Sequence, residues 1–331
     1  MAIDIGIDLG TSKTLVYVKD EGIVLNEPSL VIKSNTTGQI VAIGEDASDM
    51  MGRTPEGVSA TQPIKGGVIT GFNATVSMLK HFVKKAAKNP IFRVRAVIGV
   101  PCGISEVESR AVVAAARSAG IKEVVLMESA LAAASGCGVD IAAPHGSMVV
   151  DIGAGICEVA VVSLGGIVVS HTTRTAGSSF DAAIVQHIKK QYNMMIGEGA
   201  AENIKISIGS VYSGMDNETM EVSGRDMVTG LPKTARVSSD EIRMCLSELA
   251  DDIVDAVKIT LENTPPELAA DVMESGIVLT GGGAMLKGLG RLININTELP
   301  VYIAENPLEC AAVGAGKATE FMLGNRNRWG F

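Results

Sequence analysis

Ile5-Gly6-Ile7-Asp8-Leu9-Gly10-Thr11, near the start of the chain, has a later counterpart in Val149-Val150-Asp151-Ile152-Gly153-Ala154-Gly155. In both copies an apolar run ends in Asp-x-Gly, small residues follow, and a second apolar run returns at 15–18 or 159–162. This pattern predicts a buried strand, a tight turn and the second strand of a hairpin. Two copies at equivalent places predict a chain of two similar halves.

Helix signals alternate with short strand signals along the 331 residues, which is typical of an α/β protein. Ser105 with Glu108 and Ser238 with Glu241 are capping-box pairs that predict two helix starts. Asn306 followed by proline predicts the start of a last helix, expected over residues 306–323. A chain of this length can form one large or two medium domains, each with its own core.

Charge and composition limit the classes of function. The formal net charge is −9, and we expect no nucleic-acid partner because duplex binding depends mainly on neutralising phosphates. No apolar run approaches the ~18 residues of a spanning helix, and a strand pattern begins where a signal peptide would need charged and apolar regions. We therefore expect a cytoplasmic protein. The 5 cysteines lie far apart without metal-site spacing, so we expect reduced thiols and no zinc site.

The two Asp-x-Gly turns have the chemistry expected of a phosphate site, because small residues let successive backbone N–H groups point at one place. Asp8 and Asp151 would hold Mg²⁺ through its waters, since magnesium keeps much of its hydration shell. A third glycine turn at 281–283 would let a base and ribose approach the backbone. The residues expected to contact a nucleotide here are Gly10, Thr11, Ser12, Lys13, Gly153, Ala154, Gly155, Gly281, Gly282 and Gly283. For either Asp-x-Gly copy alone, a simple hairpin turn is the alternative.

Further motifs along the whole chain carry a family resemblance. They include Asn26-Glu27-Pro28-Ser29, Val97-Ile98-Gly99-Val100-Pro101, Thr229-Gly230-Leu231-Pro232, Thr264-Pro265-Pro266-Glu267-Leu268 and Leu279-Thr280-Gly281-Gly282-Gly283. Together with the two Asp-x-Gly turns, they resemble the actin, sugar-kinase and heat-shock-chaperone ATPase superfold and, within it, the MreB-type bacterial actins. The resemblance implies an α/β, actin-like fold of two lobes, each with a core βαβ subdomain and a smaller insertion, and a nucleotide cleft between them.

The resemblance also implies boundaries, ligands and assembly. Lobe I would cover 1–143, with an insertion at about 30–70 and the helix 306–323, and lobe II would cover 144–305, with an insertion at about 180–260. Residues 324–331 would be a flexible tail. ATP or ADP would bind with Mg²⁺, and copies of the chain would form paired protofilaments. Glu202 and Lys205 would flank the adenosine, and the alternative for Lys205 is a solvated helix face.

The chain departs from the family at the positions that serve hydrolysis. The family pattern Glu-Glu-Pro-x-Ala-Ala-Ala supplies a glutamate that orients the attacking water, and Ser129 stands at that position here. A threonine of the second turn that helps place the same water is replaced by Ile156. Glu128 is a weaker candidate for the lost role, because adjacent residues on a helix point about 100° apart. We therefore expect nucleotide binding with slow hydrolysis, since phosphoryl transfer depends mostly on positioning and charge stabilisation.

The segment containing Ile91 and Phe92 resembles the membrane-insertion loop of MreB. Lysine and arginine residues surround this apolar pair, which suits contact with an anionic leaflet. We expect peripheral contact with the inner face of the cell membrane. The alternative is that Phe92 packs against its own lobe.

Other functions compete with that of a filament subunit. A nucleotide-locked adaptor, or a copolymerising partner of another actin-like protein, is the strongest alternative because the water-positioning groups are lost. A small-molecule kinase would need a carboxylate base beside an acceptor pocket, and no residue is supported for that role beyond fold analogy. A chaperone ATPase is disfavoured, because no substrate-binding domain is expected after Phe331.

Overall fold

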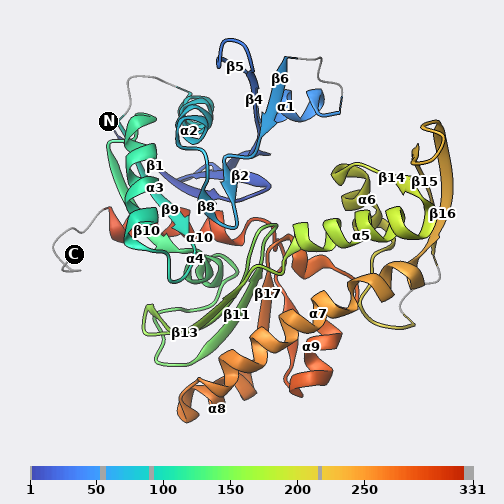
Figure 1. Cartoon of the computed structure of the whole chain (residues 1–331). Coiled ribbons are helices and arrows are strands. Elements are labelled where there is room, and N and C mark those ends of the chain that lie inside the picture. Colours follow the sequence, from blue (N-terminus) through green and yellow to red (C-terminus); the bar gives the residue numbers. More distant parts are fainter. Residues whose placement is uncertain (1, 53–56, 89–92, 215–217, 324–331) are drawn as a thin grey trace. The chain divides into compact units, whose positions relative to one another are not determined.

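The computed structural model describes residues 2–52, 57–88, 93–214 and 218–323, and the chain divides into two units. Unit 1 consists of Met1–Pro144, Val162–Ile167 and Leu308–Phe331, and unit 2 consists of His145–Val161 and Val168–Pro307. A five-stranded sheet with packed helices forms the centre of each unit (Figure 1). The lobe boundaries expected from the sequence stay a prediction.

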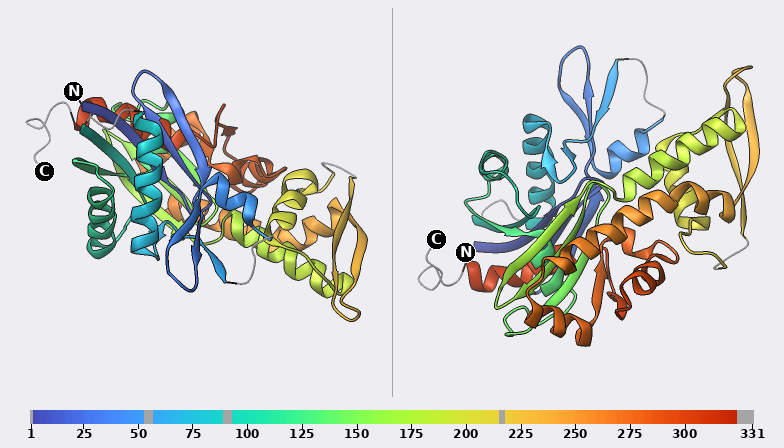
Figure 2. Two further views of the ribbon diagram at one scale, coloured as in Figure 1. Left: turned by 90° about the horizontal axis from the view of Figure 1, so that it is seen from above. Right: turned by 60° about the horizontal axis from the view of Figure 1, so that its bottom comes forward.

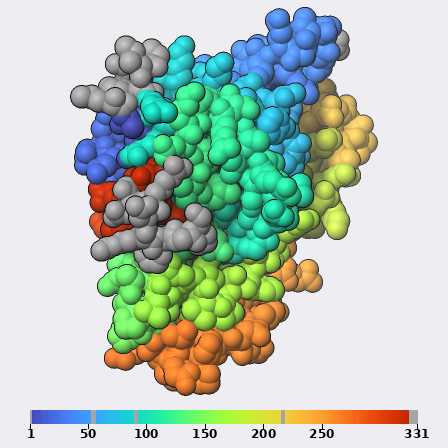
Figure 3. All heavy atoms as spheres, turned by 90° about the vertical axis from the view of Figure 1, so that its left-hand side faces the viewer, coloured from blue at the N-terminus to red at the C-terminus, as the bar shows by residue number. Residues whose placement is uncertain are grey.

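The sheet of unit 1 has the strand order β10-β9-β1-β2-β3, in which β1 pairs antiparallel with β2 and parallel with β9. Its strands are β1 (Ala2–Leu9), β2 (Lys13–Val18), β3 (Gly22–Pro28), β9 (Arg93–Val100) and β10 (Glu123–Glu128). Ile5, Ile7 and Leu9 of β1 share a core with the helices α2 (Phe72–Ala87) and α3 (Glu106–Ser118). Because side chains alternate along a strand, Asp8 belongs to the opposite face. α3 lies at the outer surface of its unit (Figure 3).

Two further helices of unit 1, α4 (Ser129–Gly136) and α10 (Cys310–Met322), pack tightly against each other. A Cβ on Gly314 would lie 1.8 Å from the carbonyl oxygen of Ala132, and one on Gly136 would lie 1.8 Å from that of Cys310. Such a close approach requires glycine at both positions. α10 also contacts β1 and β9, so these two helices cover the sheet face that carries Asp8.

The predicted start of the last helix at Asn306 is wrong, because α10 begins at Cys310. The carbonyl oxygen of Pro307 accepts a hydrogen bond from the backbone N–H of Gly281 at 2.8 Å. In a helix that carbonyl would accept from the N–H of the residue four positions later. The segment therefore forms a turn before α10 instead of its first turn.

The smaller elements of unit 1 lie between β3 and α2. They are β4 (Val31–Ser34), β5 (Ile40–Ile43), α1 (Glu45–Met50), β6 (Val58–Thr61), β7 (Ile64–Lys65) and β8 (Val68–Ile69). β5, β4 and β6 form a three-stranded sheet, which shares a small core of Leu30, Ile32 and Ala47 with α1.

The sheet of unit 2 has the order β13-β12-β11-β17-β18, in which β17 pairs parallel with both β11 and β18. Its strands are β11 (Ser147–Ile152), β12 (Cys157–Ser163), β13 (Gly166–Thr173), β17 (Ile277–Thr280) and β18 (Val301–Ile303). This order repeats that of unit 1, with β11 in the place of β1, β12 in the place of β2 and β17 in the place of β9. The internal repeat predicted from the sequence is therefore confirmed at the level of sheet topology.

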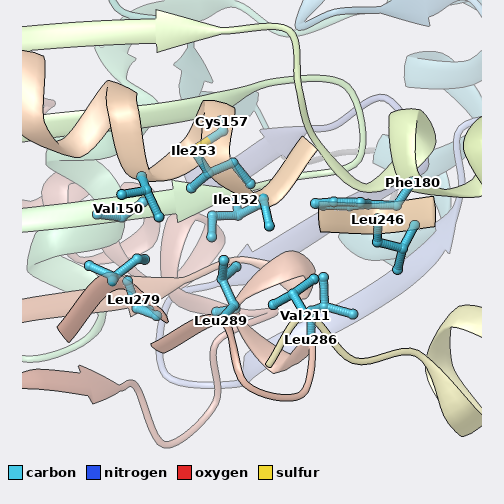
Figure 4. Close-up of a cluster of buried hydrophobic side chains, with 14 of the residues drawn as sticks. Val150, Ile152, Cys157, Phe180, Val211, Leu246, Ile253, Leu279, Leu286 and Leu289 are labelled. Atoms are coloured by element: carbon cyan, nitrogen blue, oxygen red, sulfur yellow. The ribbon is translucent and has the colours of Figure 1, made fainter. Parts of the chain in front are cut away.

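Helices complete unit 2 and supply most of its core. They are α5 (Gly177–Tyr192), α6 (Glu198–Ile208), α7 (Ser239–Glu262), α8 (Pro266–Ser275), the 3₁₀ helix η1 (Gly282–Met285) and α9 (Leu289–Thr297). α5 and α7 contact each other along the unit (Figure 2). Phe180, Ile253 and Leu289 from α5, α7 and α9 pack with Val150 and Ile152 of β11 (Figure 4). Both capping boxes form as predicted, at the starts of α3 and α7.

A second small sheet in unit 2 consists of β14 (Met194–Met195), β15 (Thr219–Asp226) and β16 (Pro232–Ser238). At the tip of its β15–β16 hairpin, Asp226 accepts a hydrogen bond from the backbone N–H of Thr229 at 2.9 Å. Lys233 forms an ion pair with the same carboxylate at 3.1 Å. The Thr229 N–H, helped by Lys233, holds the pKa of Asp226 well below its usual range.

Candidate functional site

Gly10 and Gly153 stand at equivalent points of two tight turns, between β1 and β2 and between β11 and β12. A Cβ on Gly10 would lie 2.5 Å from the carbonyl oxygen of Lys13, and one on Gly153 would lie 3.3 Å from that of Ile156. Both turns thus bring a glycine against the carbonyl group three residues later. The turn residues 11–12 and 154–155 are at least partly exposed, so they are accessible to a ligand.

Buried hydroxyl groups hold the first turn in place. Ser29, which is wholly buried, donates its hydroxyl to the carbonyl oxygen of Gly10 at 2.7 Å. Its backbone N–H donates to the carbonyl oxygen of Ser12 at 2.8 Å, and the Thr14 hydroxyl lies 2.8 Å from its own. The sequence motif at 26–29 includes Ser29 but does not predict this role, because Ser29 and Gly10 are 19 positions apart in the chain.

The start of α5 holds the second turn. The backbone N–H groups of Gly177 and Ser178 donate to the carbonyl oxygens of Gly153 at 3.0 Å and Ala154 at 2.8 Å. A Cβ on Gly177 would lie 3.3 Å from the Cα of Ala154, so the helix start and the turn are in direct contact. These two hydrogen bonds therefore fix the second turn to the first residues of α5.

Lys205 of α6 lies beside this helix start. Its ammonium group donates to the carbonyl oxygen of Gly177 at 3.2 Å and pairs with Asp181 at 2.8 Å. The Lys205 side chain is only 16% exposed, which contradicts the alternative of a solvated helix face. Burial raises the pKa of Asp181, and the hydrogen bond from Lys205 acts in the opposite direction. Glu202, on the same helix, is exposed.

Asp151 is the second-last residue of β11, and its register partner in the parallel strand β17 is Thr280, the last residue of that strand. The Thr280 hydroxyl donates to Oδ1 of Asp151 at 3.1 Å. Burial raises the pKa of Asp151 to about 6, and the bond from Thr280 acts in the opposite direction. A nearby cation would favour the ionised form of this carboxyl, so its surroundings fit a magnesium ion held through water. Asp8 lies at the equivalent place, one residue before the end of β1, and both Asp8 and Asp151 are partly exposed.

Ser129 and Glu128 lie at the junction of β10 and α4, in the same unit as Asp8. The expectation that both are helical is wrong, because Glu128 is still paired with Val100 of β9 and is exposed. Ser129 is the first residue of α4, and its Oγ lies 3.0 Å from the place of a Cβ on Gly99. Gly99 is the register partner of Asp8, so the Ser129 hydroxyl lies near the strand end that carries this carboxylate.

Ile156 ends the second turn and is half-buried, and Cys157 after it is wholly buried at the start of β12. Burial, together with the charge of Asp151, raises the pKa of the Cys157 thiol. The thiol therefore stays protonated and offers only a weak hydrogen-bond donor. Neither residue supplies the hydroxyl group that the resemblance leads one to expect at this turn.

The third turn lies against the end of β11. Gly281 has a positive φ of 76°, and a Cβ there would lie 2.4 Å from the carbonyl oxygen of Ile152. Gly282 and Gly283 begin η1, and a Cβ on Gly283 would lie 2.2 Å from the Ile152 side chain. Within unit 2, the structure therefore brings Asp151 and the third turn together.

Some expected features lie outside the described residues, namely Ile91, Phe92 and the tail 324–331. In the described ranges, no group of three or more His, Cys, Asp or Glu side chains is placed to hold a metal ion. Among the helices of the same ranges, none combines the length and the apolar character needed to cross a membrane.

Comparisons with known proteins find similar sequences and structures along almost the whole chain. A family model described as MreB/Mbl protein matches residues 2–326. The cell shape-determining protein Mbl of Bacillus cereus is 48% identical over 328 residues, which cover 99% of this chain and 97% of the relative. The crystal structure of MreB5 of Spiroplasma citri bound to ADP matches with a TM-score of 0.93 and 37% identity over 99% of both chains. The MamK double helical filament matches in fold, with a TM-score of 0.83 and 22% identity over 97% of this chain and 99% of MamK.

Proposed function

Because the chain belongs to the MreB/Mbl family and has an actin-like fold, we propose that it is an ATP-binding subunit of a cytoskeletal filament. One observation carries this proposal. An Asp-x-Gly turn follows the central strand of each five-stranded sheet, β1 in unit 1 and β11 in unit 2, and the two sheets have the same strand order. The filament consists of paired protofilaments and serves cell shape or intracellular organisation. The name of Mbl and the double helical filament of MamK support assembly of this kind.

ATP or ADP binds with its phosphates at the backbone N–H groups of the two turns. Lys13, exposed at the start of β2, adds a positive charge to that region. Residues 281–283 receive the base and ribose, with Glu202 and Lys205 beside the adenosine. The ADP in the related MreB5 structure supports nucleotide binding as such.

Magnesium, when bound, neutralises part of the phosphate charge. Asp8 and Asp151 hold it through water, each from the end of the first strand of its repeat. The half-buried position of Asp151, its raised pKa and its hydrogen bond from Thr280 support this role, since a carboxylate of that kind gains from a nearby cation.

Hydrolysis is slow, because Ser129 and Ile156 lack the groups that orient the attacking water. Glu128 is a poor substitute, since it is exposed at the end of β10 rather than on α4. The same loss favours a second candidate function, that of a nucleotide-locked adaptor or a copolymerising partner of another actin-like protein. A small-molecule kinase is less well supported.

The protein acts in the cytoplasm, at the inner face of the cell membrane. Ile91 and Phe92, between basic residues, form the peripheral membrane contact. Each single contact is weak, and assembly strengthens binding because many subunits of one filament hold the membrane together.

Sedimentation and electron microscopy of the purified protein, with Mg-ATP, with Mg-ADP and without nucleotide, test the proposal. A filament subunit forms pelletable paired strands that depend on nucleotide. An adaptor binds nucleotide but pellets only together with another actin-like filament. A protein that stays small under all conditions, and with added actin-like filaments, would refute both functions and favour a kinase.

A further inference from the structure

The contact between Thr280 and Asp151 joins two strands whose sequences predict no relation between them. The two residues are register partners in the parallel pair of β11 and β17, so their side chains leave the sheet on the same face. Thr280 is wholly buried, and its hydroxyl donates to Oδ1 of Asp151 at 3.1 Å. A β-branched side chain in a strand has few rotamers, so this hydroxyl is held at one place.

Gly281, which follows Thr280, lies on the other side of Oδ1 of Asp151. A Cβ on Gly281 would lie 2.6 Å from Oδ1 of Asp151, so only glycine leaves room for the carboxylate in this orientation. Oδ1 is thus enclosed between the Thr280 hydroxyl and the Cα of Gly281. Oδ2 of Asp151 accepts no hydrogen bond from the described part of the chain and is the oxygen left for a ligand.

The first repeat is built differently at the equivalent place. The register partner of Asp8 in β9 is Gly99, which has no side chain to donate a hydrogen bond. The space above Gly99 is occupied by the Ser129 hydroxyl, 3.0 Å from the place of a Cβ. A hydroxyl donor on the neighbouring parallel strand is therefore specific to the second repeat.

The geometry points to Thr280 as the positioning residue of Asp151: its hydroxyl holds Oδ1 so that Oδ2 faces the water shell of magnesium. This inference rests on the proposed function, since it requires a nucleotide bound with magnesium. A partner that orients a ligand of a metal shell typically contributes about 10–100-fold to metal affinity. Thr280→Val keeps the shape of the side chain and removes only the donor.

The test measures binding of a fluorescent ATP analogue to the full chain against Mg²⁺ concentration and in EDTA. Thr280→Val should raise the Mg²⁺ concentration for half-maximal binding about tenfold, and change binding in EDTA less than about twofold. Thr280→Ser, which keeps the hydroxyl, should retain the wild-type magnesium dependence. Combined with Asp151→Asn, Thr280→Val should add no further loss, because the group it orients is already changed.

Thr260→Val is the matched control. Thr260 is another wholly buried threonine of unit 2, whose hydroxyl donates to the carbonyl oxygen of Ala256 at 2.8 Å within α7. Its loss should leave the magnesium dependence unchanged. If Thr280→Val does not fold, Thr280→Cys, with its weak donor, takes its place and should show the same rise.

Two results would overturn the inference alone: wild-type magnesium dependence in the Thr280 variant, or an equal loss of binding with and without magnesium. A wild-type chain that binds no ATP analogue, or binds it equally well in EDTA, would overturn the nucleotide or magnesium part of the proposed function and the inference with it. The wild-type measurement therefore separates the two kinds of failure.

Discussion

Replacing Ser129 by glutamate and Ile156 by threonine would restore the two groups that the family resemblance assigns to the attacking water. Ser129 is a half-buried first residue of α4, where an acidic side chain is favourable near the helix N-terminus. Ile156 is a half-buried turn residue rather than part of the core of unit 2. Both changes should therefore leave the fold intact while changing the chemical step.

The expected gain follows from two opposing terms. A single orienting group contributes about 10²–10⁴-fold in rate, which corresponds to ~2.7–5.4 kcal/mol. Because Ser129 lies over Gly99, the partner of Asp8, a glutamate carboxylate there would lie about 7 Å from Asp8, given a strand spacing of ~4.8 Å. Two like charges at that distance repel by ~2.4 kcal/mol at an effective dielectric constant of about 20. The difference of ~0.3–3.0 kcal/mol corresponds to a gain of about 2–150-fold from the glutamate alone, and the threonine should add to it.

Phosphate release from assembled protein at saturating ATP measures this gain, and nucleotide affinity is determined in parallel. Each single variant should gain less than the double variant. Glu128→Gln is the control at the neighbouring position, and its rate should stay within about twofold of wild type because Glu128 is exposed at the end of β10. A wild-type rate equal to that of ordinary actin-like ATPases, or a double variant that binds ATP normally without any gain, would refute the reasoning.

Three further outcomes are expected. Asp8→Asn and Asp151→Asn should each weaken nucleotide binding in Mg²⁺ by about tenfold or more but not in EDTA, and unchanged calorimetric affinity in both variants would remove these residues from the metal site. Ile91→Ser with Phe92→Ser should abolish co-sedimentation with anionic liposomes while filaments still form, whereas retained liposome binding would support a loop packed on its own lobe. Asp226 has a lowered pKa, so its ionised form stabilises the hairpin above about pH 4, and this contribution is lost as the pH falls toward the folded-state pKa. Asp226→Asn should therefore lower the unfolding temperature at about pH 7, by an amount that shrinks toward about pH 3, and a constant difference would contradict this assignment.

The repeated turns were predictable because their signals are local. Strand alternation, the aspartate at the strand end and the turn glycine all lie within one short segment, so Asp8 and Asp151 could be matched from the sequence alone. The strand order of the two sheets confirms the repeat, because β1 and β11 occupy the same central place in their sheets.

Contacts between distant segments were not predictable. Thr280 and Asp151 are separated by 129 positions, and their contact depends on a parallel register that no local pattern specifies. Lys205 reaches Asp181 from the next helix, and both side chains look like ordinary surface residues in the sequence. At Asn306 the local cap signal was overridden, since the following carbonyl group bonds to Gly281 instead of starting a helix.

The close packing of α10 on α4 means that unit 1 cannot finish folding in the order in which it is synthesised. Roughly 170 residues separate the two helices, and a ribosome takes on the order of 10–30 s to add them. The core of unit 2 comes entirely from His145–Pro307, so it can close while the alanine-rich face of α4 still lacks its partner. During that interval the nascent chain exposes Ala132 and its neighbours, which are buried in the finished fold. Chaperones that act during translation therefore have a defined surface to protect. A chain truncated before α10 would have a folded unit 2 and an incomplete unit 1.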